Sequence, residues 1–447
     1  MPRSKQAKAV LTSGALAATL TLSLSAMAAD QGAAALQARI SELERQLAAA
    51  RTELEQAKSA QQAAEEKMAA ANDLGPDKIE ITDPTGGTLK IGGAIRANYA
   101  VGDYGDATGG PSRAEGDYGD FSLDTFRVNL DYTNDAFLGK AEYRFYNGYN
   151  FVRTAWLGYD FDNGGQVQVG VNRVPFGPGP YGVSQSWFFD QHYYVGLSDD
   201  MDLGVKYTQP VGNWTFDVAY YYSDEGTGAG DSRDSARYSY DVVNESGDGY
   251  EERNQLNARA IYSMKDVAVP TDLGVSLQYG QLSSEGPQDD GDQFAASVHM
   301  VNKWNNFTLA TQLTRYEIDV DADQPLGTDK LVQFGAYDFP STAATEAWIP
   351  AISLSYYHET PGLAWLDYVI PYVEYSAVVK DESDFNDSEL VTLGAAWGRG
   401  GWYIYTDLAY SNGNEFVGGE TGFGDRLGAN EDDDWQYRFN INFGYYF

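Results

Sequence analysis

The sequence predicts an all-β fold: a 16-stranded antiparallel transmembrane β-barrel preceded by an α-helical coiled coil. Three observations lead to this prediction. From residue 87 to the end, apolar and aromatic residues recur at every second position, as in strands with one apolar face. Short turns alternate with long acidic loops, which is typical of barrels that span a membrane. Residues 33–72 instead show the 3–4 apolar spacing of a coiled coil.

The composition excludes several functions. The 447 residues include 65 Asp and Glu against 30 Lys and Arg, giving a formal net charge of -35, so a nucleic-acid partner is not expected. With no Cys and three His, the chain has no thiolate ligands and few candidates for a metal site or catalytic triad. We expect no metal, no cofactor and no enzymatic activity, because His299 faces the predicted lumen without a partner nucleophile.

Residues 1–28 form a predicted secretory signal peptide. Three basic residues lie within the first eight positions, residues 9–26 carry no charge, and Ala26-Met27-Ala28 supplies the small residues that precede cleavage. A single transmembrane helix is the alternative interpretation of the same run.

Residues 29–75 form the predicted coiled coil, and residues 76–86 a linker. Ile40, Leu47 and Leu54 occupy one core position of successive heptads. The pattern implies an oligomer without deciding between two and three strands. A single amphipathic helix lying on a partner is the alternative.

Residues 87–447 form the predicted barrel. A secreted β-sandwich or propeller is the competing fold, but the strands are long enough to cross a membrane at a tilt, and Tyr and Trp lie near their ends. The segment 331–339 is either an extra strand or part of a loop. The predicted strands are 88–102, 121–133, 138–147, 152–161, 166–173, 201–209, 213–223, 253–264, 272–282, 292–302, 305–316, 347–359, 369–380, 388–398, 401–411 and 435–447.

The signal peptide, the alternating strands and the terminal Phe447 resemble those of Gram-negative outer-membrane porins. The last strand ends in Phe447, and porins use a C-terminal Phe as an assembly signal. The runs 89–99 (LKIGGAIRANY) and 167–177 (VQVGVNRVPFG), together with the coiled-coil-like N-terminus, are similar to the phosphate-selective porin O/P superfamily. The resemblance implies a location in the cell outer membrane, a periplasmic coiled coil and a homotrimer of 16-stranded pores. Because Lys and Arg are sparse, we do not extend phosphate selectivity to this chain.

The pleat predicts which residues line the pore. Residues that alternate with the apolar set on the first three strands and the last strand face inward, and several are basic. Solvated or salt-bridged lumen charges without a role in selectivity are the alternative. The predicted basic wall consists of Arg96, Arg127, Lys140, Arg144 and Arg438.

The loop 174–200 is the predicted constriction, because it is the most aromatic loop and its Trp-Phe-Phe run would be a costly apolar patch in water. Asp190 and Asp199 are expected to face the basic wall. Packing at the trimer interface is the alternative. The predicted constriction residues are Trp187, Phe188, Phe189, Asp190, His192 and Asp199.

These features favour a trimeric outer-membrane porin for passive diffusion of small hydrophilic solutes and ions. From the net charge we expect mildly cationic selectivity, and from the location we expect contacts with outer-membrane lipid and lipopolysaccharide. The alternative function is a structural outer-membrane anchor that tethers the envelope through its coiled coil, with peptidoglycan as the partner.

Overall fold

The computed structural model describes residues 79–104, 119–146, 148–226, 237–243, 248–265, 267–337, 339–418 and 424–447. The predicted signal peptide, the predicted coiled coil and the first part of the linker lie outside the described residues. Among the described residues, no helix has both the length and the apolar character needed to cross a membrane.

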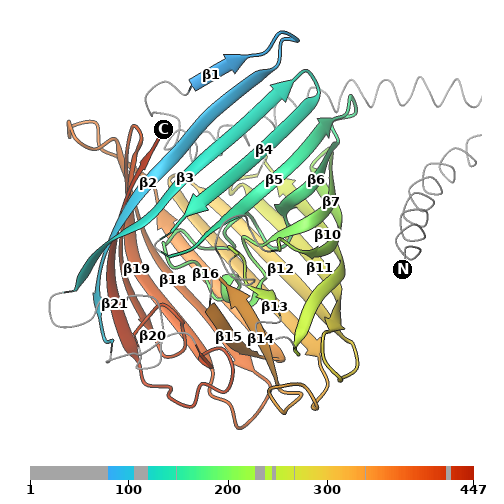
Figure 1. The fold of residues 1–447 in the computed structure, drawn as a ribbon. Helices are drawn as coiled ribbons and strands as arrows, with labels where there is room; N and C mark the ends of the chain where they lie inside the picture. Colours follow the sequence, from blue (N-terminus) through green and yellow to red (C-terminus); the bar gives the residue numbers. More distant parts are fainter. Residues whose placement is uncertain are drawn as a thin grey trace, which may run out of the picture. The chain divides into compact units, whose positions relative to one another are not determined.

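In the described part of the chain, sixteen antiparallel strands close into a barrel (Figure 1). Each strand pairs with the next barrel strand in sequence, and β21 pairs with β2 to close the wall. The barrel strands are β2 (Thr88–Gly102), β3 (Asp120–Asn134), β4 (Phe137–Phe145), β5 (Asn150–Asp160), β6 (Gln166–Arg173), β7 (Met201–Val211), β8 (Trp214–Asp224), β10 (Tyr250–Met264), β11 (Thr271–Ser284), β12 (Gly291–Trp304), β13 (Phe307–Asp319), β16 (Glu346–Tyr356), β18 (Tyr368–Lys380), β19 (Ser388–Arg399), β20 (Trp402–Ser411) and β21 (Gln436–Tyr446).

The barrel prediction is confirmed strand by strand, and the ambiguous segment 331–339 is resolved. It contributes β14 (Leu331–Ala336) and the start of β15 (Phe339–Ala344), which pair with each other. β14 also pairs with β9 (Asp241–Val242), so these three strands form a separate small sheet. Two further short strands, β1 (Ile79–Thr82) and β17 (His358–Glu359), extend the pairing at the ends of β2 and β18.

The pleat separates lipid-facing from lumen-facing residues as the sequence predicts. On β11, the outward Val275 and Leu277 are each 51% exposed, whereas the intervening Ser276 is fully buried. Apolar residues face outward because the surrounding solvent is hydrocarbon, and polar residues face the interior.

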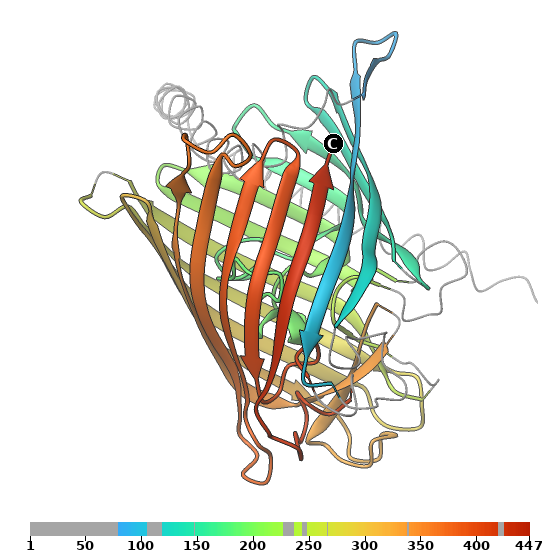
Figure 2. The same ribbon diagram turned by 90° about the vertical axis from the view of Figure 1, so that its left-hand side faces the viewer.

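Closure of the barrel depends on the last residues of the chain. Gly93 donates its backbone N–H to the Phe447 carbonyl at 2.8 Å, and the Phe447 N–H donates to Gly93 at 3.0 Å. Inside the same seam, the Asn98 and Asn442 amides hydrogen-bond across β2 and β21. Figure 2 shows β21 in red beside β2 in blue.

The largest hydrophobic core lies among the long loops. It joins Tyr193 and Tyr194 of the loop 174–200 to Tyr240 beside β9 and to Phe334 on β14. The loops that connect β6 to β7, β8 to β10 and β13 to β16 therefore pack against one another as a unit. This packing positions the loop segment that enters the lumen.

Candidate functional site

The lumen contains a cavity of about 1060 Å³. All five residues of the predicted basic wall line it, and so do Trp187 and Phe189 of the predicted constriction loop. The lining also carries many tyrosines, so it combines cations, phenol hydroxyls and aromatic faces. Among the described residues, the basic side chains of the lining are Arg96, Arg127, Lys140, Arg144, Arg153, Arg173, Lys206 and Arg438.

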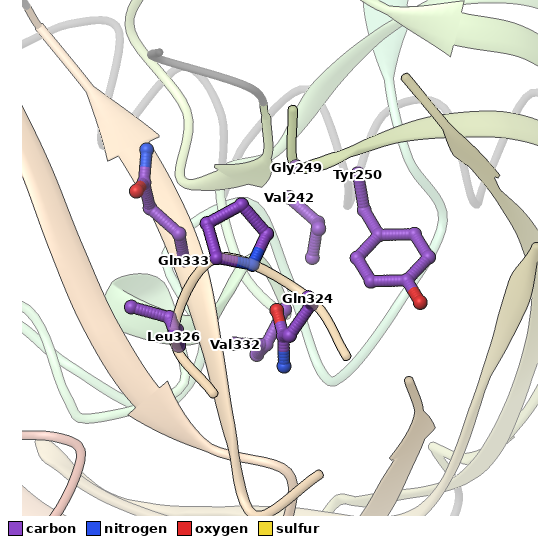
Figure 3. Close-up of a pocket in the computed structure, with 8 residues that line it drawn as sticks. Val242, Gly249, Tyr250, Gln324, Leu326, Val332 and Gln333 are labelled. Carbon is purple, nitrogen blue, oxygen red and sulfur yellow. The ribbon is translucent and has the colours of Figure 1, made fainter. Parts of the chain in front are cut away.

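A second hollow is too small to admit a solute. It lies beside β9 and β14, is lined by Val242, Tyr250, Gln324, Leu326 and Val332, and has a volume of about 10 Å³ (Figure 3). A volume of this size holds at most one water molecule.

The loop 174–200, the predicted constriction, folds into the barrel. Its main chain is hydrogen-bonded to inward-facing side chains of strands that are distant in sequence. The Gly177 N–H donates to Ser276 on β11 at 3.1 Å, and the Gln191 N–H donates to Ser376 on β18 at 3.0 Å. These contacts lie within one chain, whereas the alternative interpretation places the loop at an interface between subunits.

Two carboxylates on the far wall hold the middle of the loop. Glu374 on β18 accepts hydrogen bonds from the Ser184 hydroxyl at 2.7 Å and the Gln185 N–H at 2.5 Å. Asp407 on β20 accepts one from the Trp187 N–H at 3.1 Å. These hydrogen bonds to side chains of two different barrel strands fix the path of the loop.

The aromatic residues of the loop have separate roles. Phe188 is fully buried against Leu390 and Val417, which anchors the loop to β19 and the β20–β21 loop. Phe189 stacks on Tyr193 with ring centroids 4.5 Å apart. Trp187 faces the cavity, and the Arg438 guanidinium lies 4.8 Å from the centre of its ring.

Asp190 differs from the expectation that it faces the basic wall. Its carboxylate accepts hydrogen bonds from the Val183 and His192 N–H groups, both at 2.9 Å, and contacts the His192 ring Nδ1 at 2.8 Å. The other ring nitrogen of His192 lies 2.8 Å from the Thr314 hydroxyl of β13. Both residues are buried, because a loop inside a barrel must satisfy its own polar groups.

Three arginines converge on Glu142. Its Oε1 lies 2.6 Å from Arg144 Nε, 3.7 Å from Arg127 Nη1 and 3.8 Å from Arg153 Nε. Arg96 pairs separately with Asp124 at 2.8 Å, and Lys140 with Asp131 at 3.4 Å. The basic wall is therefore ion-paired, but its cations outnumber the carboxylates that they contact.

Asp199 contacts two arginines of the cavity lining that lie outside the predicted basic wall. Its Oδ1 lies 2.6 Å from Arg153 Nη2 and 2.7 Å from Arg173 Nη2, and Tyr238 donates its hydroxyl to Oδ2 at 2.8 Å. Burial opposes the charged form, but the two arginines lower the pKa of Asp199 below its usual value. Asp199 is thus a fixed negative charge that joins the constriction loop to β5 and β6.

Sequence reasoning missed Arg153, Arg173 and Lys206. Arg153 and Arg173 lie on β5 and β6, at the ends nearest the long loops. The predicted basic wall covers only the first three strands and the last strand, so it does not include them. A register shift between β4 and β5 at Glu142 also breaks simple alternation there. The signal in the sequence that could have identified Arg153 and Arg173 is the presence of basic residues near the ends of β5 and β6.

No protein-family model matches the sequence, and no curated protein matches it. Solved structures match the fold. The outer-membrane channel DcaP of Acinetobacter baumannii is 12% identical, with 82% of this chain and 99% of that chain covered and a TM-score of 0.52. An anion-selective porin from Comamonas acidovorans is 13% identical, with 81% and 100% covered and a TM-score of 0.50.

The barrel fold, which the chain shares with these outer-membrane proteins, and the apolar outward surface of its strands place the protein in an outer membrane.

Proposed function

We propose that the protein is a porin through which small hydrophilic solutes and ions diffuse passively. The observation that carries this proposal is the cavity of about 1060 Å³ inside a closed barrel, with a charged wall on one side and the folded-in loop 174–200 on the other. A lumen of this kind selects solutes by size and by electric field.

We further propose that the constriction favours anions. Among the described residues, eight basic side chains line the cavity against two acidic ones, Asp124 and Glu142. The net charge of -35 predicts the opposite preference. However, acidic loops outside the constriction are screened beyond about 8 Å at physiological salt, so the local wall dominates.

The test is the reversal potential of the reconstituted protein in a planar bilayer under a KCl gradient. The wild type is expected to show anion preference, and the Arg96→Ala/Arg127→Ala variant is expected to shift toward cations. An Arg399→Ala variant serves as the matched control, because Arg399 is exposed at the end of β19 and does not line the cavity.

Two results would contradict the proposal. Cation preference in the wild type would show that the outer loops set the field. An unchanged reversal potential in the double variant would show that the basic wall has no part in selectivity.

We also propose a homotrimer, which the height of the wall supports. β4 has 9 residues and β6 has 8, against 15 in β10. At about 3.4 Å per residue and a tilt near 40°, eight residues rise only about 20 Å, less than an apolar band of about 25 Å. Subunit packing against the short strands β4 and β6 would shield them, and native mass spectrometry of the detergent-extracted protein tests the stoichiometry.

Kinship to the phosphate-selective porin O/P superfamily is a further part of the proposal, and it rests on the runs 89–99 and 167–177.

A further inference from the structure

Five carboxylates gather at the long-loop end of the barrel, away from the lumen cavity. They come from four segments of the chain, and four of the five are at most 6% exposed, with Glu225 half-buried. The five are Asp200 at the end of the constriction loop, Asp202 on β7, Glu225 after β8, Asp241 on β9 and Glu252 on β10.

Few cations compensate this charge. Among the described residues, the cation in contact with the group is Arg237, whose Nη1 lies 3.7 Å from Asp241 Oδ2 and also pairs with Asp224. One guanidinium cannot neutralise so many buried carboxylates. Buried charges are otherwise paired or bound to a metal ion, because transferring them from water is costly.

Several oxygens in the group have no hydrogen-bond donor. These are Oδ1 of Asp200, Oδ1 of Asp202 and both carboxylate oxygens of Asp241. The neighbouring polar groups are already used elsewhere: Gln255 donates to the other oxygen of Asp202 at 3.0 Å, and the Val242 N–H donates to Glu252 at 2.8 Å. Buried acceptors that lack a hydrogen-bond donor and lie close to one another indicate a missing positive ligand.

We propose that Asp200, Asp202 and Asp241 bind a divalent cation, with Ca²⁺ as the best fit. One oxygen from each lies within 4.8 Å of the others. Ca²⁺ accepts an irregular shell of protein oxygens at about 2.3–2.6 Å, whereas Mg²⁺ demands near-ideal octahedral geometry and usually keeps several of its waters. A buried group of carboxylates from the protein therefore suits Ca²⁺ better than Mg²⁺. Carboxylates are also the ligands that hard cations prefer.

The cation has a structural consequence for the pore. It joins the end of the constriction loop to β7 and to β9, which belongs to the loop between β8 and β10. Asp199, next to Asp200, holds Arg153 and Arg173. Binding at this site therefore fixes the segment that positions two cations of the lumen wall, and it does so whichever solute the pore carries.

The experiment measures Ca²⁺ binding to the full barrel, extracted from outer membranes, stripped with EDTA and dialysed at pH 7.5. Isothermal titration with CaCl₂ is expected to give one saturable site per chain, with at least tenfold weaker binding of Mg²⁺. The Asp200→Asn/Asp241→Asn variant is expected to lose this site. The Asp432→Asn/Asp433→Asn variant removes two acidic residues from an exposed run and is expected to keep it.

Heat-modifiable migration in gel electrophoresis establishes that each variant is folded. If the double variant does not fold, the single Asp241→Asn variant replaces it. The single variant is expected to bind Ca²⁺ at least tenfold more weakly than the wild type. Absence of a saturable site in the wild type would overturn the proposal, since the carboxyls would then share protons instead. Retention of the site by the double variant, or its loss in the exposed control, would overturn the assignment as well.

Discussion

Replacing Glu374 by Ala is expected to release the middle of the constriction loop. Glu374 accepts two hydrogen bonds from that loop, from Ser184 at 2.7 Å and from the Gln185 N–H at 2.5 Å. Leaving a buried hydrogen-bond donor without its acceptor costs about 1–3 kcal/mol, so losing the acceptor of two donors removes about 3 kcal/mol of anchoring. That loss raises the population of the undocked segment by about a hundredfold, at 1.4 kcal/mol per factor of ten.

The assay is single-channel recording in planar bilayers. The Glu374→Ala channel is expected to show a larger mean conductance and more current noise, because the freed segment moves within the lumen. The matched control is Glu389→Ala on β19, whose carboxylate accepts a hydrogen bond from Tyr375 at an exposed position. Traces of Glu374→Ala that match those of the wild type would refute the reasoning that this carboxylate fixes the loop.

Three other predictions concern assembly, lipid contact and selectivity. Deleting Phe447 removes two backbone hydrogen bonds to Gly93 and is expected to lower the yield of heat-modifiable barrel in outer membranes; an undiminished yield would contradict its role in assembly. Val298→Arg places a charge on the lipid face of β12 and is expected to lower the free energy of unfolding, measured with denaturant in vesicles, by about 2–4 kcal/mol. For Val211→Arg, which lies near a turn, the expected loss is about 0–1 kcal/mol. Equal costs would argue that the two positions lie at the same depth. Asp199→Asn frees two arginines and is expected to strengthen anion preference in 0.1 M KCl but not in 1 M KCl, where charges are screened within about 3 Å. A shift that persists at 1 M would indicate a change in pore shape instead.

The barrel could be predicted from sequence because each strand faces two different solvents. On β11, Val275 and Leu277 face lipid while Ser276 faces the interior, so alternation alone identifies the strand and its orientation. The same rule placed Arg96 and Arg127 on the lumen wall. It did not apply to β14 and β15, which belong to a loop and do not face lipid on one side and the lumen on the other, and so the segment 331–339 stayed ambiguous.

The contacts inside the lumen were not predictable in this way. Glu374 and Asp407 hold a loop that precedes them by about 190 and 220 positions, and no local pattern links such residues. The carboxylate group of Asp200, Asp202 and Asp241 likewise forms only when the start of β7 meets β9, about 40 positions further along the chain. Spacing rules for calcium loops concern a single continuous segment, so they exclude one kind of site and say nothing about this one.

The seam between β2 and β21 has a consequence for the timing of folding. The Asn98 side chain donates a hydrogen bond to Asn440, which lies 342 positions later in the chain. The edge of β2 that faces β21 therefore has no partner until β21 has been added to the barrel. Contacts between such distant residues form slowly, because the entropy of closing the intervening chain is lost before any bond forms. Until then both strands present open edges that can pair with another chain. The unfolded chain therefore depends on cellular factors that prevent it from pairing with other copies of itself before it reaches the membrane.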